Sequence, residues 1–215
     1  MGFMIIAVVL TVALYTVKIM ATSARRKRLR TVAAGRDWTY APRVRDLPGR
    51  RLPFSFFWGS SRDIMTGQHG SSAFVAFTAV TGRNRPDYGV VGVQLPNMLP
   101  ELELTREGMG TAIAKAFGGQ DLLVGHPQFD ARYRIQSRDP GYVVTLLNPA
   151  VVAWFMAPRR WENFAVRGGF LQAWTPGGLS YEQLPWVLDE LNDLVARIGE
   201  DVWGGWGAPT YPLNR

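Results

Sequence analysis

The chain has 215 residues, and none is cysteine, which excludes disulfide bonds, thiolate metal sites and cysteine nucleophiles. Its 24 lysine and arginine residues exceed its 17 acidic residues, for a net charge of +7. Residues 25–62 hold eleven of the basic residues and two of the acids, whereas residues 63–215 carry more acids than bases. Because the positive charge is confined to one short stretch, we do not expect nucleic-acid binding.

The first 24 residues predict a transmembrane helix. They contain a single charged side chain, Lys18, and about 20 apolar residues in a helix cross a hydrocarbon core of roughly 30 Å. Lys18 lies near the end of the segment, where a long side chain reaches the lipid headgroups. The alternative is a cleaved signal peptide, which has basic residues in front of its apolar run. Here the basic residues follow the run, so a retained anchor is favoured. They are Arg25, Arg26, Lys27, Arg28 and Arg30.

These five basic residues also predict the orientation of the chain. Lysine and arginine accumulate on the cytoplasmic side of a membrane span, and none precedes this one. We therefore expect the N-terminus outside the plasma membrane and the rest of the chain in the cytoplasm. Beside the bilayer, each basic side chain adds about 1 kcal/mol of attraction to anionic headgroups. The alternative is a stop-transfer signal without selectivity for any lipid.

The first half of the remaining chain predicts a basic helix followed by antiparallel strands. Residues 25–35 continue the anchor as a juxtamembrane helix that ends at Gly35. Residues 42–59 are rich in arginine, proline and glycine and are expected to be irregular. His69-Gly70-Ser71 is a turn between two strands, the second of which is apolar on both faces. Strands are expected at residues 37–41, 63–68, 72–81, 88–95 and 101–105.

The second half mixes helices and strands. Gly168-Gly169 is a two-residue hairpin signal. The clearest element is a helix at 184–198, in which leucine, valine and isoleucine recur at three-four spacing and predict a face packed on the sheet. Ser180 and Gln183 have the spacing of a capping box in front of it. Further helices are expected at 109–117, 139–147 and 149–156, and further strands at 132–137, 163–167 and 170–175.

Together these elements predict an α+β fold. We expect an antiparallel sheet packed with short helices and a longer C-terminal helix, preceded by one N-terminal transmembrane helix. A globular part of about 185 residues is one domain by size and can bury roughly 70% of its unfolded surface. The predicted parts are a transmembrane anchor (1–24), a basic juxtamembrane helix (25–35), a cytoplasmic α+β domain (36–202) and a Gly/Pro/Trp tail (203–215).

No residue pattern predicts a catalytic, cofactor-binding or metal-binding site. The two histidines, His69 and His126, lack the spacing of histidine metal motifs and are expected in ordinary loops. Gly108-Met109-Gly110 resembles part of a dinucleotide fingerprint, but Ile113 stands where a third small residue is required. We therefore expect no cofactor.

The carboxylates do not predict a site either. Glu101 and Glu103 would share one face of a strand, a geometry compatible with acid–base chemistry or a hard cation. Such a pair on an exposed strand is more commonly solvated, and we expect both in water. Asp130 and Asp139 are expected to organise turns or to cap helices.

Several tryptophans lie near the C-terminus. Trp203, Trp206 and Tyr211 stand among glycine and proline, so the tail is expected to be irregular. Tryptophan favours membrane interfaces and protein interfaces alike. Two interpretations stay open: the tail straps back across the domain, or it is a docking peptide. Trp161, which follows two arginines, is expected to fold onto the core.

The order of these segments resembles a family of uncharacterised, membrane-anchored actinobacterial proteins. The resemblance rests on RRKRL, GRDWTY, SAFVAFTAV, GVVGVQLPNMLPELELTREG, HPQFDARYRIQSRDPGYVVTLLNPAVVAWF and GGFLQAW. It covers roughly residues 25–200 and is most specific over 93–150, which is also similar to a wider bacterial domain of unknown function. It consists of apolar spacers, turns and prolines, so it implies fold and topology but no substrate, cofactor or catalytic residue.

The function expected from the sequence is a membrane-anchored, non-enzymatic binding or scaffolding module, such as an accessory subunit of a membrane complex. The expected partners are the anionic headgroups of the bilayer and a membrane protein. The alternative is a membrane-tethered enzyme whose site is assembled from residues far apart in the sequence.

Overall fold

A computed structural model describes residues 2–44, 60–81, 86–106, 120–158, 161 and 163–209. For residues 2–14, 18 and 120 it describes the backbone alone. The predicted helix at 109–117, most of the predicted irregular segment at 42–59 and the end of the tail, with Tyr211, lie outside the described residues.

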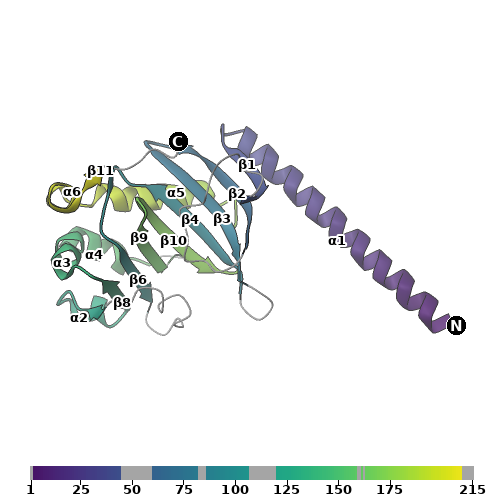
Figure 1. Ribbon diagram of the computed structural model, residues 1–215, viewed down its shortest axis with the longest axis horizontal. Helices are drawn as coiled ribbons and strands as arrows, with labels where there is room; N and C mark the ends of the chain where they lie inside the picture. Colours follow the sequence, from purple (N-terminus) through teal and green to yellow (C-terminus); the bar gives the residue numbers. More distant parts are fainter. Residues whose placement is uncertain are drawn as a thin grey trace.

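In the described part of the chain, nine strands form one sheet with antiparallel pairing throughout (Figure 1). Their order is β1-β2-β3-β4-β10-β9-β6-β8-β7. The strands are β1 (Thr39–Arg43), β2 (Ser60–His69), β3 (Ser72–Val80), β4 (Tyr88–Gln94), β6 (Leu102–Arg106), β7 (Gln120–Leu122), β8 (Tyr133–Ser137), β9 (Asn163–Arg167) and β10 (Phe170–Pro176). Two further short strands, β5 (Asn97–Met98) and β11 (Ala208–Pro209), pair with each other.

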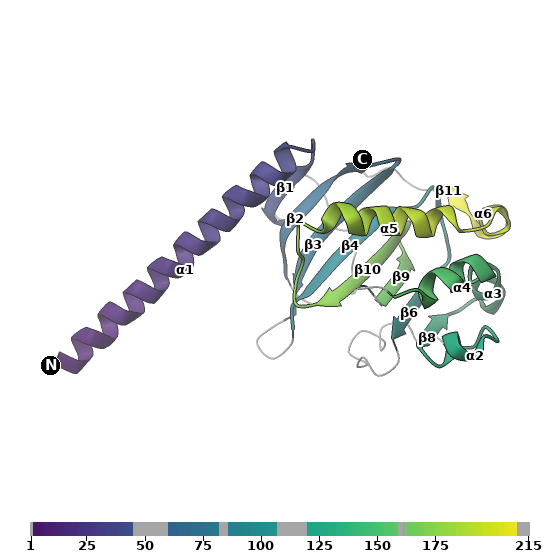
Figure 2. The same ribbon diagram turned by 180° about the vertical axis from the view of Figure 1, so that it is seen from behind.

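Helices cover one face of this sheet. Helix α5 (Leu184–Ala196) crosses it diagonally, and α2 (Pro127–Asp130), α3 (Pro140–Leu146) and α4 (Pro149–Met156) cluster beside β6 and β8 (Figure 2). The predicted stripe of α5 is buried at Leu184, Val187, Leu188, Leu191 and Leu194. Burying one such side chain contributes about 1.5–3 kcal/mol, so this stripe holds α5 on the sheet.

The predicted α+β fold, with its antiparallel sheet and C-terminal helix, is confirmed. Gly168 and Gly169 form the predicted hairpin, and both have the left-handed backbone that glycine tolerates, with φ of 58° and 77°. The predicted capping box is wrong. The Ser180 hydroxyl donates to the Glu182 carboxylate instead, and Gln183 makes no side-chain cap to α5.

The tail prediction is also wrong in part. Residues 200–206 form a helix, α6 (Glu200–Trp206), despite the glycines at 204 and 205. Within α6, Val202 is fully buried in the main hydrophobic core, and Trp203 and Trp206 pack against that core. Burial of these three side chains outweighs the roughly 1 kcal/mol by which each glycine disfavours a helix.

A single helix, α1 (Gly2–Ala34), precedes the sheet and projects away from it (Figure 1). The predicted anchor and the predicted juxtamembrane helix are therefore continuous. In the part of the chain that the structure describes, no helix is both long and apolar enough to cross a membrane. The predicted span falls largely on residues 1–14 and 18, whose side chains lie outside that part, and it stays a prediction.

Candidate functional site

The C-terminal part of α1 is built into the domain. Leu29 and Ala33 are 4% and 2% exposed and belong to the main hydrophobic core. The chain then turns at Gly35 and enters β1 through Trp38, whose indole N–H donates to the Gln68 carbonyl over 3.0 Å. Two apolar side chains of the helix before residue 36 thus complete the core, and the domain boundaries expected from the sequence stay a prediction.

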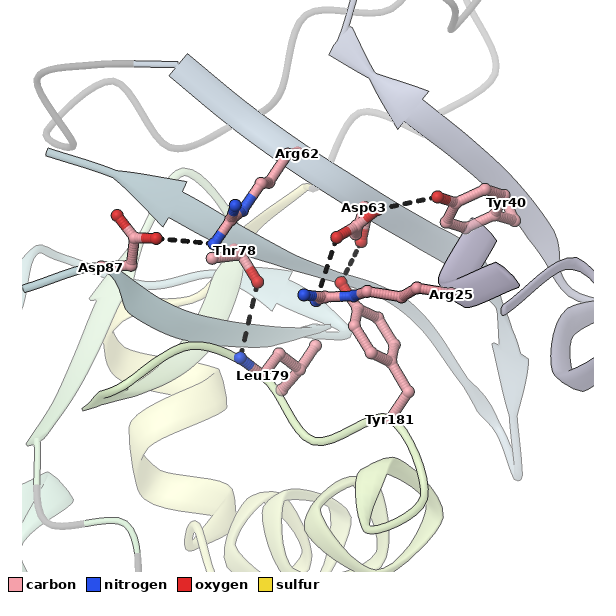
Figure 3. A network of polar contacts seen from close by, with 8 residues as sticks. All are labelled: Arg25, Tyr40, Arg62, Asp63, Thr78, Asp87, Leu179 and Tyr181. Atoms are coloured by element: carbon pink, nitrogen blue, oxygen red, sulfur yellow. Dashed lines mark hydrogen bonds and ion pairs between the residues drawn. The ribbon is translucent and has the colours of Figure 1, made fainter. Parts of the chain in front are cut away.

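Asp63 is the centre of this junction (Figure 3). It lies in β2 where the register with β3 shifts between Arg62 and Met65, and its φ of 53° is left-handed. A bulge of this kind aims a side chain away from the regular alternation of a strand. The residue is 7% exposed. The bulge thus presents one carboxylate to α1 and β1 at the point where they meet.

Two donors from different elements converge on the Asp63 carboxylate. The Tyr40 hydroxyl of β1 donates to its Oδ1 over 2.7 Å, and the Arg25 guanidinium of α1 lies 3.0 Å from its Oδ2. Burial and the hydrogen bond to Asp63 both raise the pKa of Tyr40, so the phenol stays protonated and remains a donor. Asp63 of β2 is therefore joined to α1 by an ion pair and to β1 by a hydrogen bond (Figure 3).

The segment that precedes α5 also contacts the junction. The Tyr181 hydroxyl donates to the Asp63 carbonyl, and the Leu179 amide donates to the Thr78 hydroxyl over 3.4 Å. A second ion pair joins Arg28 of α1 to Glu182 over 2.9 Å. Both side chains of that pair are largely exposed, so it contributes little energy. We name the set Arg25, Arg28, Tyr40, Asp63, Tyr181 and Glu182 the junction cluster.

The predicted membrane-surface residues divide between two environments. Arg25 and Arg28 are bound to Asp63 and Glu182 of the domain. Arg26 is half-buried, and Lys27 and Arg30 are exposed. Nothing in this geometry tests contact with lipid, which stays a prediction for all five residues. The sequence did not predict a role for Tyr40, Asp63 or Tyr181. The only signal for this site is a single acidic residue, Asp63, inside a predicted strand.

The tail residues lie over the helical end of the domain. The Trp206 indole donates to the Asp139 carboxylate over 2.9 Å, and its ring lies 6.1 Å from that of Tyr142. The Tyr142 amide and Trp206 hydrogen bonds together hold the pKa of Asp139 below its ordinary value. As far as Pro209, the tail packs back across the domain, as the first of the two interpretations expects. A role of Trp203, Trp206 or Tyr211 in binding a partner stays a prediction.

The expected turn and cap residues are in place. Asp130 accepts the amides of Val124 and Gly125, each over 3.0 Å, and Asp139 caps α3 by accepting the Tyr142 amide. His126 caps α2. His69 ends β2 and pairs with Asp189 of α5 over 2.7 Å, which fastens that strand to the helix. The predicted burial of Trp161 is confirmed at 5% exposure.

One predicted solvent position is wrong. Glu101 is exposed and forms an ion pair with Arg167, but Glu103 is 1% exposed. Neither oxygen of the Glu103 carboxyl has a hydrogen-bond partner among the described residues. Burial raises the pKa of Glu103 to about 7, against the lowering effect of Arg167 and Arg134. The prediction assumed an exposed strand, whereas β6 lies between β8 and β9, and Gln136 and Ala165 of those strands flank Glu103 on its face of the sheet.

The described residues contain no group of three or more histidine, aspartate or glutamate side chains able to hold a metal ion. Among the described carboxyl groups, that of Glu103 has a pKa near neutrality. Because the group is buried, no substrate reaches it in this conformation.

The chain matches no model of a known protein family and no curated protein sequence. Its structure is similar to the crystal structure of the mycobacterial trehalose monomycolate transport factor A, TtfA. The TM-score is 0.56 with 16% sequence identity, and the match covers 86% of this chain and 97% of that one. At this identity the likeness shows the fold alone. The neighbour's mycobacterial source agrees with the resemblance to actinobacterial proteins.

Proposed function

We propose that this protein is a non-enzymatic accessory module of a transport system at the cytoplasmic face of the plasma membrane, where α1 anchors it. The fold that it shares with a transport factor, over nearly the whole length of that protein, supports the accessory role. The observation that carries the proposal is the junction cluster, which builds the last turns of α1 into the domain while the rest of the helix leaves it (Figure 1).

The part of α1 that leaves the domain exposes apolar side chains. Tyr15, Val17, Ile19 and Met20 are each more than half exposed. They point in different directions around the helix, so one partner groove would not cover them all, whereas a surrounding lipid phase would. The residues before Tyr15 continue the same apolar composition in the sequence.

A continuous helix also sets the height of the domain above the bilayer. At 1.5 Å per residue, Leu29 in the core lies about 7.5 Å along the axis from the end of the predicted span at residue 24. That distance is within the Debye length of about 8 Å at physiological salt. A flexible linker would let the domain diffuse away, whereas this junction keeps the face around Arg25 beside the headgroups.

The topology follows from the charge asymmetry around the span. A C-terminal green fluorescent protein fusion should fluoresce in intact bacteria, and a C-terminal alkaline phosphatase fusion should be inactive. Removal of residues 2–24 should move the chain from the membrane fraction to the supernatant. An active phosphatase fusion, or a full chain that salt alone washes from membranes, would contradict the proposal.

The surface that we propose for a protein partner lies between α2, α3 and α4. It is a groove of about 510 Å³, lined mostly by apolar side chains that include Val144, Pro149, Val152 and Met156. Val144 is 60% exposed. Exposed apolar surface of this kind is typical of protein interfaces. The three helices around the groove lie at the end of the domain remote from α1 (Figure 2).

Val144→Glu should therefore abolish co-purification of a partner from native membranes in mild detergent. Since Val144 is exposed, the variant should change the free energy of unfolding by no more than about 0.5 kcal/mol. Ala150→Glu is the matched control, because it places the same charge at an exposed position of α4 that does not line the groove. Equal recovery of the partner with Val144→Glu and with the unmodified chain would exclude this groove.

A further inference from the structure

A second groove follows the junction, between α1 and strands β1 and β2. Its volume is about 440 Å³, and its polar lining includes Arg25, Arg26, Arg43, Ser60, Ser61 and Arg62. Four arginines thus line one cavity, and Asp63 is the acidic residue among its described lining.

The charges in this groove are not balanced. Arg25 is paired with Asp63 over 3.0 Å, and Arg62 is paired with Asp87 over 2.6 Å. Arg26 and Arg43 form no ion pair with any residue that the structure describes. Among the described residues, the positive charge of the groove that lacks an ion-pair partner therefore comes from one arginine of α1 and one of β1.

The strand register is a second, independent observation that favours an anion at this place. Arg43 of β1 lies directly opposite Arg62 of β2. Like charges at directly opposed positions of neighbouring strands destabilise a sheet. An anion bound between α1 and the two strands would offset this repulsion as well as the charge of Arg26.

From this arrangement we propose that the groove binds a phosphate group. Guanidinium groups hold phosphate oxygens through paired N–H donors, and hydroxyls such as those of Ser60 and Ser61 supply further donors. Two sources share this chemistry: the headgroup of an anionic lipid and a free phosphate. The lipid source rests on the proposed function, because Thr22 of the lining lies in the last turn of the predicted span and Arg26 lies two residues beyond its end.

The test compares two variants of the full chain in neutral detergent micelles at physiological salt. Arg26→Gln/Arg43→Gln removes both unpaired charges of the groove. Lys27→Gln/Arg30→Gln removes the same charge from exposed positions of α1 that do not line it. The probes are inorganic phosphate and the water-soluble lipid dihexanoyl phosphatidylglycerol, and their affinities are measured by isothermal titration calorimetry.

We expect the groove variant to weaken binding at least tenfold and the control variant less than twofold. The single exposed substitution Arg43→Gln, which removes no described contact, should weaken it severalfold and keeps the test valid if the double variant is unstable. Tighter binding of the lipid than of phosphate supports the site with a lipid source, and equal binding supports it with a free phosphate.

Equal weakening by both double variants would overturn the proposal in favour of diffuse charge attraction, and so would the absence of binding to either probe. The phosphate site and the membrane anchor are refuted by different results. Phosphate binding at the groove by a chain that does not fractionate with membranes would keep the site and refute the anchor.

Discussion

Replacing Asp63 with alanine should lower the free energy of unfolding by about 3 kcal/mol. The substitution leaves the Tyr40 hydroxyl without its acceptor and Arg25 without its carboxylate. A hydrogen bond to a charged group contributes about 1.5–3 kcal/mol, whereas the ion pair adds less because Arg25 is 45% exposed. A left-handed alanine costs about 1 kcal/mol more. Urea denaturation followed by tryptophan fluorescence measures the change.

Two other substitutions at Asp63 separate these contributions. Asp63→Asn keeps an acceptor for Tyr40 and tolerates a left-handed backbone, so it should cost about 1 kcal/mol. Asp63→Gly relieves the backbone but removes both contacts, so it should cost about 2 kcal/mol. If alanine, asparagine and glycine all left stability unchanged, Asp63 would not hold α1 to the sheet.

The elements that the sequence predicted well are those with local signals. The α5 stripe repeats within one helix, and the Gly168-Gly169 turn lies between strands that pair with each other. Both depend on residues close in the chain. The strand at 72–81 was equally clear, because a strand buried on both faces is apolar throughout.

The junction cluster could not be predicted in the same way. Asp63 contacts Arg25, Tyr40 and Tyr181, which lie 38 positions before it, 23 before it and 118 after it. No spacing rule connects residues so far apart. The bulge that aims Asp63 depends on a register shift with β3, which appears only once the strands are paired.

Glu103 shows where the alternation of polar and apolar residues fails to predict which side chains are exposed. The sequence ELELT predicts a strand with one polar face, and an amphipathic strand usually turns that face to water. Here β6 pairs with β8 and β9, both of which follow it by many residues. The polar face of β6 lies beside Gln136 and Ala165 of those strands, and the carboxyl is buried.

The buried carboxyl of Glu103 should make the protein less stable as the pH rises. Its pKa is raised from 4.5 to about 7 in the folded state. Between these values the folded protein holds more protons than the unfolded chain, so stability falls with increasing pH through this window and levels off above about pH 7. The rise in pKa corresponds to roughly 3 kcal/mol of lost stability.

Glu103→Gln should remove this dependence, because an amide does not ionise. At pH 8 the variant should be more stable than the unmodified chain by roughly 2–3 kcal/mol, and near pH 4.5 the two should be nearly equal. Urea denaturation of the full chain in neutral detergent, at several values between pH 4.5 and 8, measures the difference. Subtracting the two curves cancels the contribution of every ionisable group that the two proteins share.

Glu101→Gln is the matched control, since it makes the same chemical change two residues away on an exposed side chain. It should leave the pH slope intact, because the side chain of Glu101 is more than half exposed to solvent. A pH slope that is identical in Glu103→Gln and in the unmodified chain would mean that the Glu103 carboxylate finds a cation or a donor when it ionises.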